Sequence, residues 1–214
     1  MRIIPIRQPQ EAAEQRAMPT ASGDIEAVLL AGGRATRLGG IDKGRLQVRG
    51  RPLAEYPLRV LEARARNVFV SANRSLAAYR AYGHPVLPDV DYPGAGPLAG
   101  IHEAMKRMDG EWLLVLPCDA PGVQVALLDR LLAARRPGDK ALVAAAGGRR
   151  HPTFSLLHRR THAALRAALA GGRHGFDAWL QGLGARVVDC SDHPEWFTNL
   201  NRPEEAAAAG AVLA

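Results

Sequence analysis

Short apolar runs, separated by polar and turn-forming residues, recur along the chain from position 25 onward. Runs of this length with such boundaries are typical of β-strands. In residues 112–116, WLLVL, every position is apolar, which predicts a central strand covered by helices on both faces. The segments predicted to form strands are 25–31, 67–72, 84–89, 111–119, 140–146 and 185–190.

Between these strands, apolar residues recur at three- and four-residue spacing, which predicts amphipathic helices. Pro57 would clash with the carbonyl group of Leu53, so the first helix is expected to kink or to begin later. The Ala-rich segment 203–214 predicts a final helix with Pro203 in its first turn. The other predicted helices comprise residues 53–65, 97–108, 125–136 and 162–172.

The alternation of strands and helices predicts an α/β fold with a doubly wound, mostly parallel sheet that carries helices on both faces. The length of 214 residues fits a single domain. Residues 1–24 are polar, contain proline and lack sustained periodicity. We interpret them as a flexible N-terminal tail, and residues 25–214 as the domain.

The composition, with 47% hydrophobic and 23% charged residues, excludes a largely disordered chain. No apolar run approaches the roughly 18 residues of a membrane-spanning helix, and residues 1–16 lack the apolar core of a signal peptide. We therefore expect a cytoplasmic protein. Cys118 and Cys190 are too few for a disulfide framework and lack zinc-type spacing, so both are expected to be free thiols.

The formal net charge of +7 favours an anionic partner: nucleic acid, an acidic membrane surface or a phosphorylated small molecule. Proteins that bind nucleic acid cluster basic residues with aromatic ones. Here the arginines are scattered and aromatic residues make up only 5% of the chain. The pattern therefore favours a small phosphorylated ligand, with neither nucleic acid nor a membrane as partner.

A glycine-rich segment, AVLLAGGRATRLGGIDKG at residues 27–44, follows the first predicted strand. In an open α/β sheet ligands bind beyond the carboxyl ends of the strands, and glycines let backbone N–H groups approach phosphate oxygens closely. Arg34, Arg37 and Lys43 add positive charge. The segment lacks the G-K-[ST] ending of a P-loop and the G-x-G-x-x-G pattern. It predicts a phosphate site, with a plain tight turn as the alternative.

Residues 30–44, LAGGRATRLGGIDKG, resemble the signature loop of the nucleotidyltransferases that make NDP-sugars. The whole set of motifs, in its order and spacing from about Ile25 to the end, resembles the molybdenum cofactor guanylyltransferases. The resemblance implies a single Rossmann-like α/β domain that uses GTP and Mg²⁺ to attach GMP to the terminal phosphate of molybdopterin, with or without bound molybdenum. The further matching segments are SANRS at 71–75, GPLAGIHEAM at 96–105, LLVLPCDAP at 113–121, HPTFSLLHRR at 151–160 and FTNLNRPEE at 197–205.

Three side chains are expected to carry the chemistry. Asp119 follows the most apolar strand, and its hard oxygen ligands suit Mg²⁺, although an Asp at this place can equally cap the next helix. The resemblance implies the metal role. Lys43 and Arg37 are expected to neutralise charge as pyrophosphate leaves, whereas Arg34 is expected to be idle. A solvated surface position is the alternative for each cation.

The nucleotide is expected to lie along the glycine-rich loop. The resemblance implies backbone contacts at Leu30, Ala31 and Gly32, with Gly33 in the same cradle. Asp89 can accept hydrogen bonds from a guanine edge or a ribose hydroxyl, or merely form a turn. Ser71 stands where family members often have a nucleotide-contacting Asn, so this contact and some base selectivity are expected to differ.

Further residues of the site are expected in later segments of the chain. Gly100 belongs to a second glycine-bearing turn, which either binds an anion at a helix N-terminus or serves packing. Asn199 and Asn201 alternate in an extended stretch and can hold the pterin or its phosphate, with a turn as the alternative. His151 lies in the acceptor region of the family. No catalytic base is expected, because the attacking phosphate is already anionic.

The function predicted from these residues is transfer of GMP from GTP to molybdopterin with release of pyrophosphate. The alternatives are the same transfer with CTP, a sugar-phosphate nucleotidyltransferase, and a non-catalytic nucleotide or cofactor carrier. Molybdenum cofactor insertion proteins or apo-molybdoenzymes are the protein partners that the resemblance implies.

Overall fold

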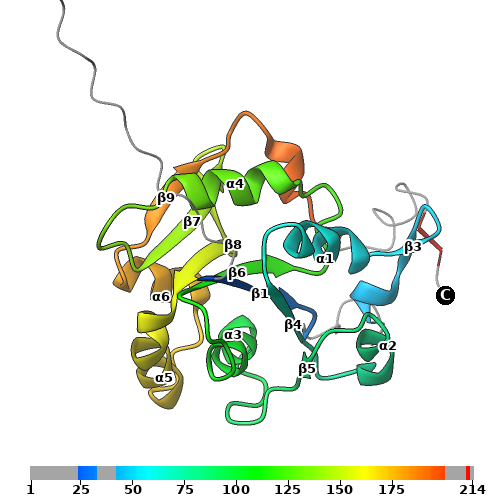
Figure 1. Cartoon of the computed structure of the whole chain (residues 1–214), viewed down its shortest axis with the longest axis horizontal. Helices are drawn as coiled ribbons and strands as arrows, with labels where there is room; N and C mark the ends of the chain where they lie inside the picture. The colour runs from blue at the N-terminus through cyan, green and yellow to red at the C-terminus, as the bar shows by residue number, and fades with distance from the viewer. Residues whose placement is uncertain (1–23, 33–41, 201–210, 213–214) are drawn as a thin grey trace, which may run out of the picture.

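A seven-stranded, mostly parallel sheet forms the centre of the molecule (Figure 1). The computed structural model describes residues 24–32, 42–200 and 211–212. The strand order is β5-β4-β1-β6-β8-β7-β9, and only β8 runs antiparallel to its neighbours. The strands are β1 (Ile25–Leu30), β4 (Asn67–Ser71), β5 (Val86–Leu87), β6 (Trp112–Pro117), β7 (Ala141–Ala146), β8 (Arg149–His158) and β9 (Arg186–Asp189).

All six strands predicted from the apolar runs are confirmed, but β8 was not predicted. This strand begins with two arginines, and Pro152 within it cannot donate a ladder hydrogen bond. The structure accommodates the proline in an irregular stretch, where the register with β7 jumps from Val143↔Ser155 to Ala145↔Arg150. The antiparallel strand β8 therefore lacks the uninterrupted apolar run that identified its neighbours in the sequence.

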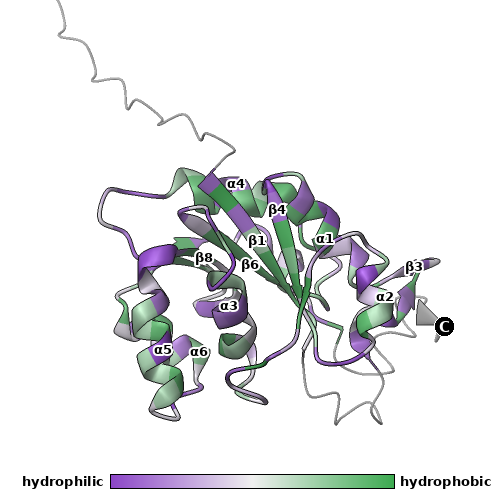
Figure 2. Ribbon diagram, turned by 60° about the horizontal axis from the view of Figure 1, so that its bottom comes forward, coloured by the Kyte–Doolittle hydropathy of each residue, from purple (hydrophilic) through white to green (hydrophobic). Residues whose placement is uncertain are grey.

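Helices cover both faces of the sheet, as predicted (Figures 1 and 2). Those on one face are α1 (Glu55–Glu62) and α4 (Val125–Ala133), and those on the other are α3 (Pro97–Met105), α5 (His162–Ala170) and α6 (Phe176–Gly182). Neither α6 nor α2 (Leu76–Arg80) was predicted, because each is shorter than the window of roughly 11–18 residues in which helical periodicity can be recognised. Helix α1 begins after Leu53, so Pro57 falls in its first turn, where no intrahelical N–H donor is needed.

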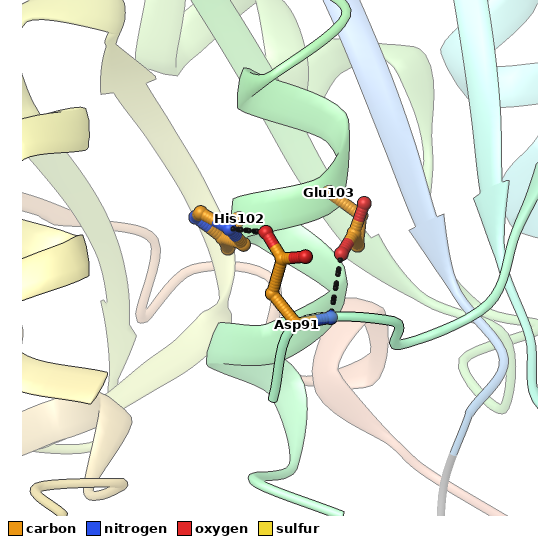
Figure 3. A group of neighbouring side chains, drawn as sticks. All are labelled: Asp91, His102 and Glu103. Carbon is orange, nitrogen blue, oxygen red and sulfur yellow. Dashed lines mark hydrogen bonds and ion pairs between the residues drawn. The ribbon is translucent and has the colours of Figure 1, made fainter. Parts of the chain in front are cut away.

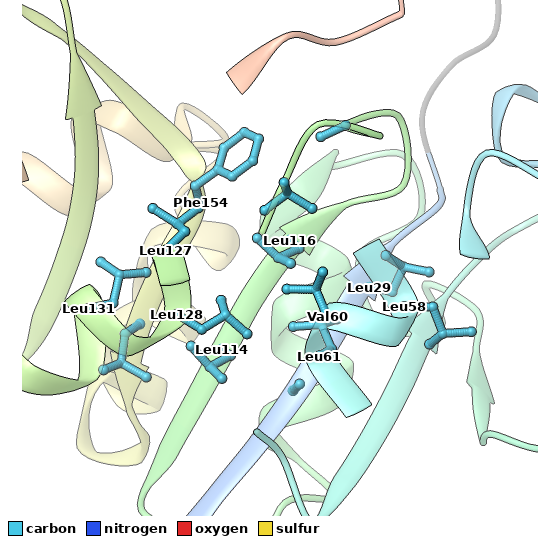
Figure 4. Packing of buried hydrophobic residues seen from close by; sticks show 14 of the residues in the cluster. Leu29, Leu58, Val60, Leu61, Leu114, Leu116, Leu127, Leu128, Leu131 and Phe154 are labelled. Atoms are coloured by element: carbon cyan, nitrogen blue, oxygen red, sulfur yellow. The ribbon is translucent and has the colours of Figure 1, made fainter. Parts of the chain in front are cut away.

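The core is a double layer divided by the sheet. On β1, Ala27 and Leu29 face α1 and α4, while Val28 faces α3. All six residues of β6 are buried, which confirms its central place. Figure 4 shows Leu116 of β6 near the leucines of α4, and Leu29 of β1 beside Leu58 of α1. This packing fixes the carboxyl ends of β1 and β6 side by side.

A small second sheet lies beside the main one. It has the order β10-β2-β3 and comprises β2 (Gln47–Val48), β3 (Arg51–Pro52) and β10 (Ala211–Val212), with β10 antiparallel to β2. The prediction of a final, fraying helix over 203–214 is therefore wrong at Ala211 and Val212, which form a strand. Gly210 weakens a helix at this point, and β2 offers backbone partners for a strand. Among the described helices, none has the length and apolar character needed to cross a membrane.

Candidate functional site

The carboxyl ends of four parallel strands meet at one edge of the sheet. The register pairs Leu30 of β1 with both Ser71 of β4 and Pro117 of β6. Beyond the strands, the Ala31 amide donates to the Ser71 carbonyl at 2.8 Å, and the Cys118 amide donates to the Leu30 carbonyl at 3.0 Å. The predicted nucleotide contacts at residues 30–32 thus lie next to the segment that carries Asp119. The predicted contact Gly33 lies outside the described residues.

Lys43 and Asp119 form an ion pair at this edge. Lys43 belongs to the 3₁₀ helix η3 (Lys43–Arg45), and its Nζ lies 3.4 Å from Oδ2 of Asp119, 76 positions away. The two side chains are 24% and 14% exposed. Burial raises the pKa of the Asp119 carboxyl, and the ammonium of Lys43 opposes this rise. Two of the three predicted catalytic residues are therefore in contact, while Arg37 and the neighbouring Arg34 lie outside the described residues.

Asp42 holds η3 in place and was not predicted from the sequence. Its Oδ1 accepts hydrogen bonds from the Gly44 amide at 3.2 Å and from the Tyr79 hydroxyl of α2 at 2.6 Å. Gly44 is buried, and a Cβ at this position would collide with the Tyr79 hydroxyl. An Asp directly before K-G-R is a possible N-cap signal, but the tyrosine contact depends on the tertiary structure.

Asp89 is held by Asn73 in a reciprocal pair of hydrogen bonds. Asn73 Nδ2 donates to Asp89 Oδ2 at 2.7 Å, and the Asp89 amide donates to Asn73 Oδ1 at 2.8 Å. The other carboxylate oxygen of Asp89 is buried and lacks a hydrogen-bond partner within the described part of the chain. Burial raises the pKa of Asp89, while Asn73 lowers it. An acceptor oxygen in this state is suited to a ligand N–H or O–H group.

Ser71 and Asn73 lie close to two of the predicted glycine positions, Gly32 and Gly100. A Cβ at Gly32 would be 3.2 Å from Asn73 Nδ2, and a Cβ at Gly100 would collide with Ser71 Oγ. Ser71 is buried, so its short side chain allows α3 to approach β4 closely. Asn73, the second polar residue of SANRS, is the one that reaches both the loop after β1 and Asp89. Sequence analysis named Ser71 and missed Asn73.

The chain returns to the site after the 3₁₀ helix η5 (Pro194–Phe197). The Leu200 amide donates to the Asp119 carbonyl at 3.0 Å, which brings Asn199 to the neighbourhood of the ion pair. Oδ1 of Asn199 is buried, with no hydrogen-bond partner among the described residues. Asn201 lies outside the described residues. The ring of His151 stacks on Phe197 with centroids 4.2 Å apart, and burial lowers the pKa of this histidine.

A second cluster of polar side chains anchors the loop between β5 and α3 (Figure 3). Asp91 Oδ2 lies 2.9 Å from His102 Nε2, and the Asp91 amide donates to Glu103 Oε1 at 3.2 Å. These three residues have ligand-type atoms within 4.8 Å of one another. Lys106 lies 2.7 Å from Asp91 and 3.4 Å from Glu103, so the chain itself supplies the cation. The cluster ties the loop that carries Asp89 to α3.

A pocket of about 780 Å³ opens between the β7–β8 turn, β9 and α6. Arg149 and Arg150 line it, and Arg150 pairs with Asp177 of α6 at 2.9 Å. None of its lining residues was predicted as a site residue, and neither Lys43 nor Asp119 belongs to it.

Comparisons with known proteins agree with this geometry. Residues 27–188 match the model of the MobA-like NTP transferase domain. The molybdenum cofactor guanylyltransferase of Shewanella halifaxensis is 36% identical over 194 residues, which cover 90% of this chain and 97% of that protein. The enzyme of the same name from Vibrio atlanticus is 38% identical over 187 residues, covering 86% and 95%.

Among solved structures, the molybdopterin-guanine dinucleotide biosynthesis protein A of Archaeoglobus fulgidus aligns with a TM-score of 0.71. The two sequences are 20% identical, and the alignment covers 86% of this chain and 96% of that one. At this identity the likeness shows the fold, which is the doubly wound α/β fold expected from the alternation of strands and helices.

Proposed function

Because the chain belongs to the family of MobA-like NTP transferases, we propose that it is a guanylyltransferase of molybdenum cofactor biosynthesis. It transfers GMP from GTP to molybdopterin and releases pyrophosphate. The observation that links this proposed function to particular residues is the Lys43–Asp119 ion pair at the carboxyl ends of β1 and β6. In an open α/β sheet this edge is where a ligand binds.

The reaction needs positioning and charge neutralisation more than proton transfer. A terminal phosphate oxygen of molybdopterin attacks the α-phosphorus of GTP, and the bond to the bridging oxygen of pyrophosphate breaks. The nucleophile is already an anion near neutral pH, so no side chain has to remove a proton. We assign to Lys43 the role of neutralising the negative charge that grows on the departing pyrophosphate. Burial lowers the pKa of His151, and this burial together with the stacking on Phe197 supports a packing role for that residue.

The family generally needs a divalent metal, and we propose that this metal is Mg²⁺ held by Asp119. The residue present fits: a carboxylate is the ligand type that Mg²⁺ prefers, and one or two carboxylates with substrate phosphates suffice. Burial raises the pKa of Asp119, so its charge is costly without a cation beside it. When bound, the metal supplies neutralisation of charge on the phosphates. Asp119 would hold it, and the ammonium of Lys43 would help to keep the carboxylate ionised.

We assign recognition of the base to Asp89. Guanine presents two adjacent donors, N1–H and N2–H₂, and the free oxygen of Asp89 is a buried acceptor. The bonds to Asn73 fix the carboxylate so that this oxygen keeps one orientation. A site built to accept from a base rejects a base that lacks the donors, because its buried polar group is then left unpaired.

The Asp89→Asn variant should lose selectivity between GTP and CTP. An amide presents an NH₂ group beside its oxygen, and this group would face the guanine donors. We expect the Kd of GTP to rise about tenfold, equal to ~1.4 kcal/mol, with a smaller change for CTP. Isothermal titration with both nucleotides and magnesium measures the ratio. A ratio of GTP to CTP affinity equal to that of the wild type would remove Asp89 from base recognition.

The proposed function is tested by thermal unfolding with GTP, CTP, ATP or UTP in the presence of magnesium. A ligand that binds only the folded state raises its stability, so GTP should give the largest upward shift. A larger shift with CTP would replace guanylyl by cytidylyl transfer. A pyrophosphate-release assay with GTP and molybdopterin separates an enzyme from a carrier, because a carrier binds without turnover.

A further inference from the structure

The side chain of Tyr79, on helix α2, contacts the segment that carries Lys43, which comprises Asp42 and η3. Tyr79 lies on α2, is fully buried and is 37 positions from Asp42. Its hydroxyl donates to Asp42 Oδ1 at 2.6 Å, and the same oxygen accepts from the Gly44 amide at 3.2 Å. Two donors on one oxygen fix the orientation of Asp42. The residue between Asp42 and Gly44 is Lys43.

The helix that carries Lys43 is too short to hold its own shape. It comprises three residues, and a 3₁₀ turn of this length has poor internal hydrogen-bond geometry. Outside contacts therefore set its position. Asp42 caps its start, and the Ala54 amide donates to the Gly44 carbonyl at 3.0 Å. The Tyr79 hydroxyl lies against Gly44, where a side chain would displace it.

We propose that Tyr79 is a positioning residue of the guanylyl transfer: through Asp42 it fixes η3, so that the Lys43 ammonium stands beside Asp119. This inference rests on the proposed function for its link to catalysis. Oδ2 of Asp42 is buried without a hydrogen-bond partner among the described residues, so the carboxylate has little else to hold it at this angle. Tyr79 remains a donor because burial raises the pKa of its hydroxyl.

The Tyr79→Phe variant tests the proposal, with Tyr82→Phe as the matched control. Tyr82 lies three residues further along, just beyond the end of α2, and packs against Tyr79 with ring centroids 6.1 Å apart. We expect Tyr79→Phe to lower kcat of pyrophosphate release about tenfold while KM for GTP changes less than about twofold. A misplaced cation stabilises the transition state less, whereas its effect on binding of the ground state is small. Tyr82→Phe should retain the wild-type kcat. Gly44→Ala should reproduce the loss of kcat, because its methyl group displaces the same hydroxyl.

A double-mutant cycle with Lys43→Ala separates positioning from a general loss of structure. If Tyr79 acts through Lys43, adding Tyr79→Phe to Lys43→Ala should cost less than about twofold in kcat. Equal losses in both backgrounds would overturn the proposal, and so would a wild-type kcat in a Tyr79→Phe variant that is merely less stable.

A readout independent of activity keeps this proposal distinct from the proposed function. Amide hydrogen exchange of residues 42–45 in the unliganded protein should be faster in Tyr79→Phe than in the wild type, with no change in Tyr82→Phe. Unchanged exchange would overturn the proposal. Absence of turnover in the wild type, with faster exchange in Tyr79→Phe, would instead contradict the proposed function.

Discussion

In the Asp119→Asn variant, turnover at saturating GTP should fall about a hundredfold to a thousandfold while the fold stays intact. The amide has nearly the same shape as the carboxylate but carries no charge for the proposed Mg²⁺. Burial disfavours the charged form of Asp119, but the substitution also leaves the ammonium of Lys43 without its carboxylate partner. Because these two effects oppose each other, we expect only a small change in the thermal unfolding temperature.

Pyrophosphate release over a range of magnesium concentrations measures this effect. Asp129→Asn is a suitable control, because Asp129 is a half-exposed carboxylate on α4 paired with Arg64 and belongs to no part of the site. It should retain wild-type turnover. Normal turnover of Asp119→Asn at ordinary magnesium concentration would exclude Asp119 from the mechanism.

The Lys43→Ala variant should lose both nucleotide affinity and maximal rate. Charge grows on the bridging oxygen as pyrophosphate leaves, so a cation beside it gains interaction energy in the transition state. A loss of roughly 2.7–4 kcal/mol, about a hundredfold to a thousandfold in kcat, would match other preorganised charges. Lys43→Arg should restore only part of the rate, because a planar guanidinium does not replace a compact ammonium.

Saturation kinetics with GTP, magnesium and molybdopterin distinguish two roles of Lys43. A higher KM with an unchanged kcat would mean that Lys43 binds the ground state and the transition state equally. Arg45→Ala is the matched control: it removes an exposed cation from the same 3₁₀ helix and should leave kcat near the wild-type value.

The fold could be predicted where the chain is apolar. Residues 112–116 are apolar throughout and form the central strand, since burial on both faces demands this pattern. The charged start of β8 hides a strand that is stabilised by the neighbours β6 and β7 rather than by its own residues. Helix α2 is too short to show periodicity. Both elements depend on tertiary contacts, which the local sequence pattern does not reveal.

Residues of the candidate site could be selected from their chemical type and from the resemblance to a family, but the contacts between them could not be predicted. Lys43 and Asp119 were each selected for their charge, and only the sheet topology brings them to 3.4 Å. Asn73 was missed because a reciprocal bond to Asp89 depends on the loop after β5, which has no sequence signature. The link from Tyr79 to Asp42 was missed for the same reason.

The pairing of β10 with β2 joins one segment that is translated early to another that is translated late. Strand β2 begins two residues after η3, yet its partner Ala211–Val212 is translated long after the rest of the sheet. Leu200, whose amide bonds to Asp119, is also late. A ribosome-bound chain can therefore complete the layers around β1 and β6 while the proposed nucleotide-binding edge still lacks the contacts made by Leu200 and β10. These late segments add their contacts only after they have emerged from the exit tunnel.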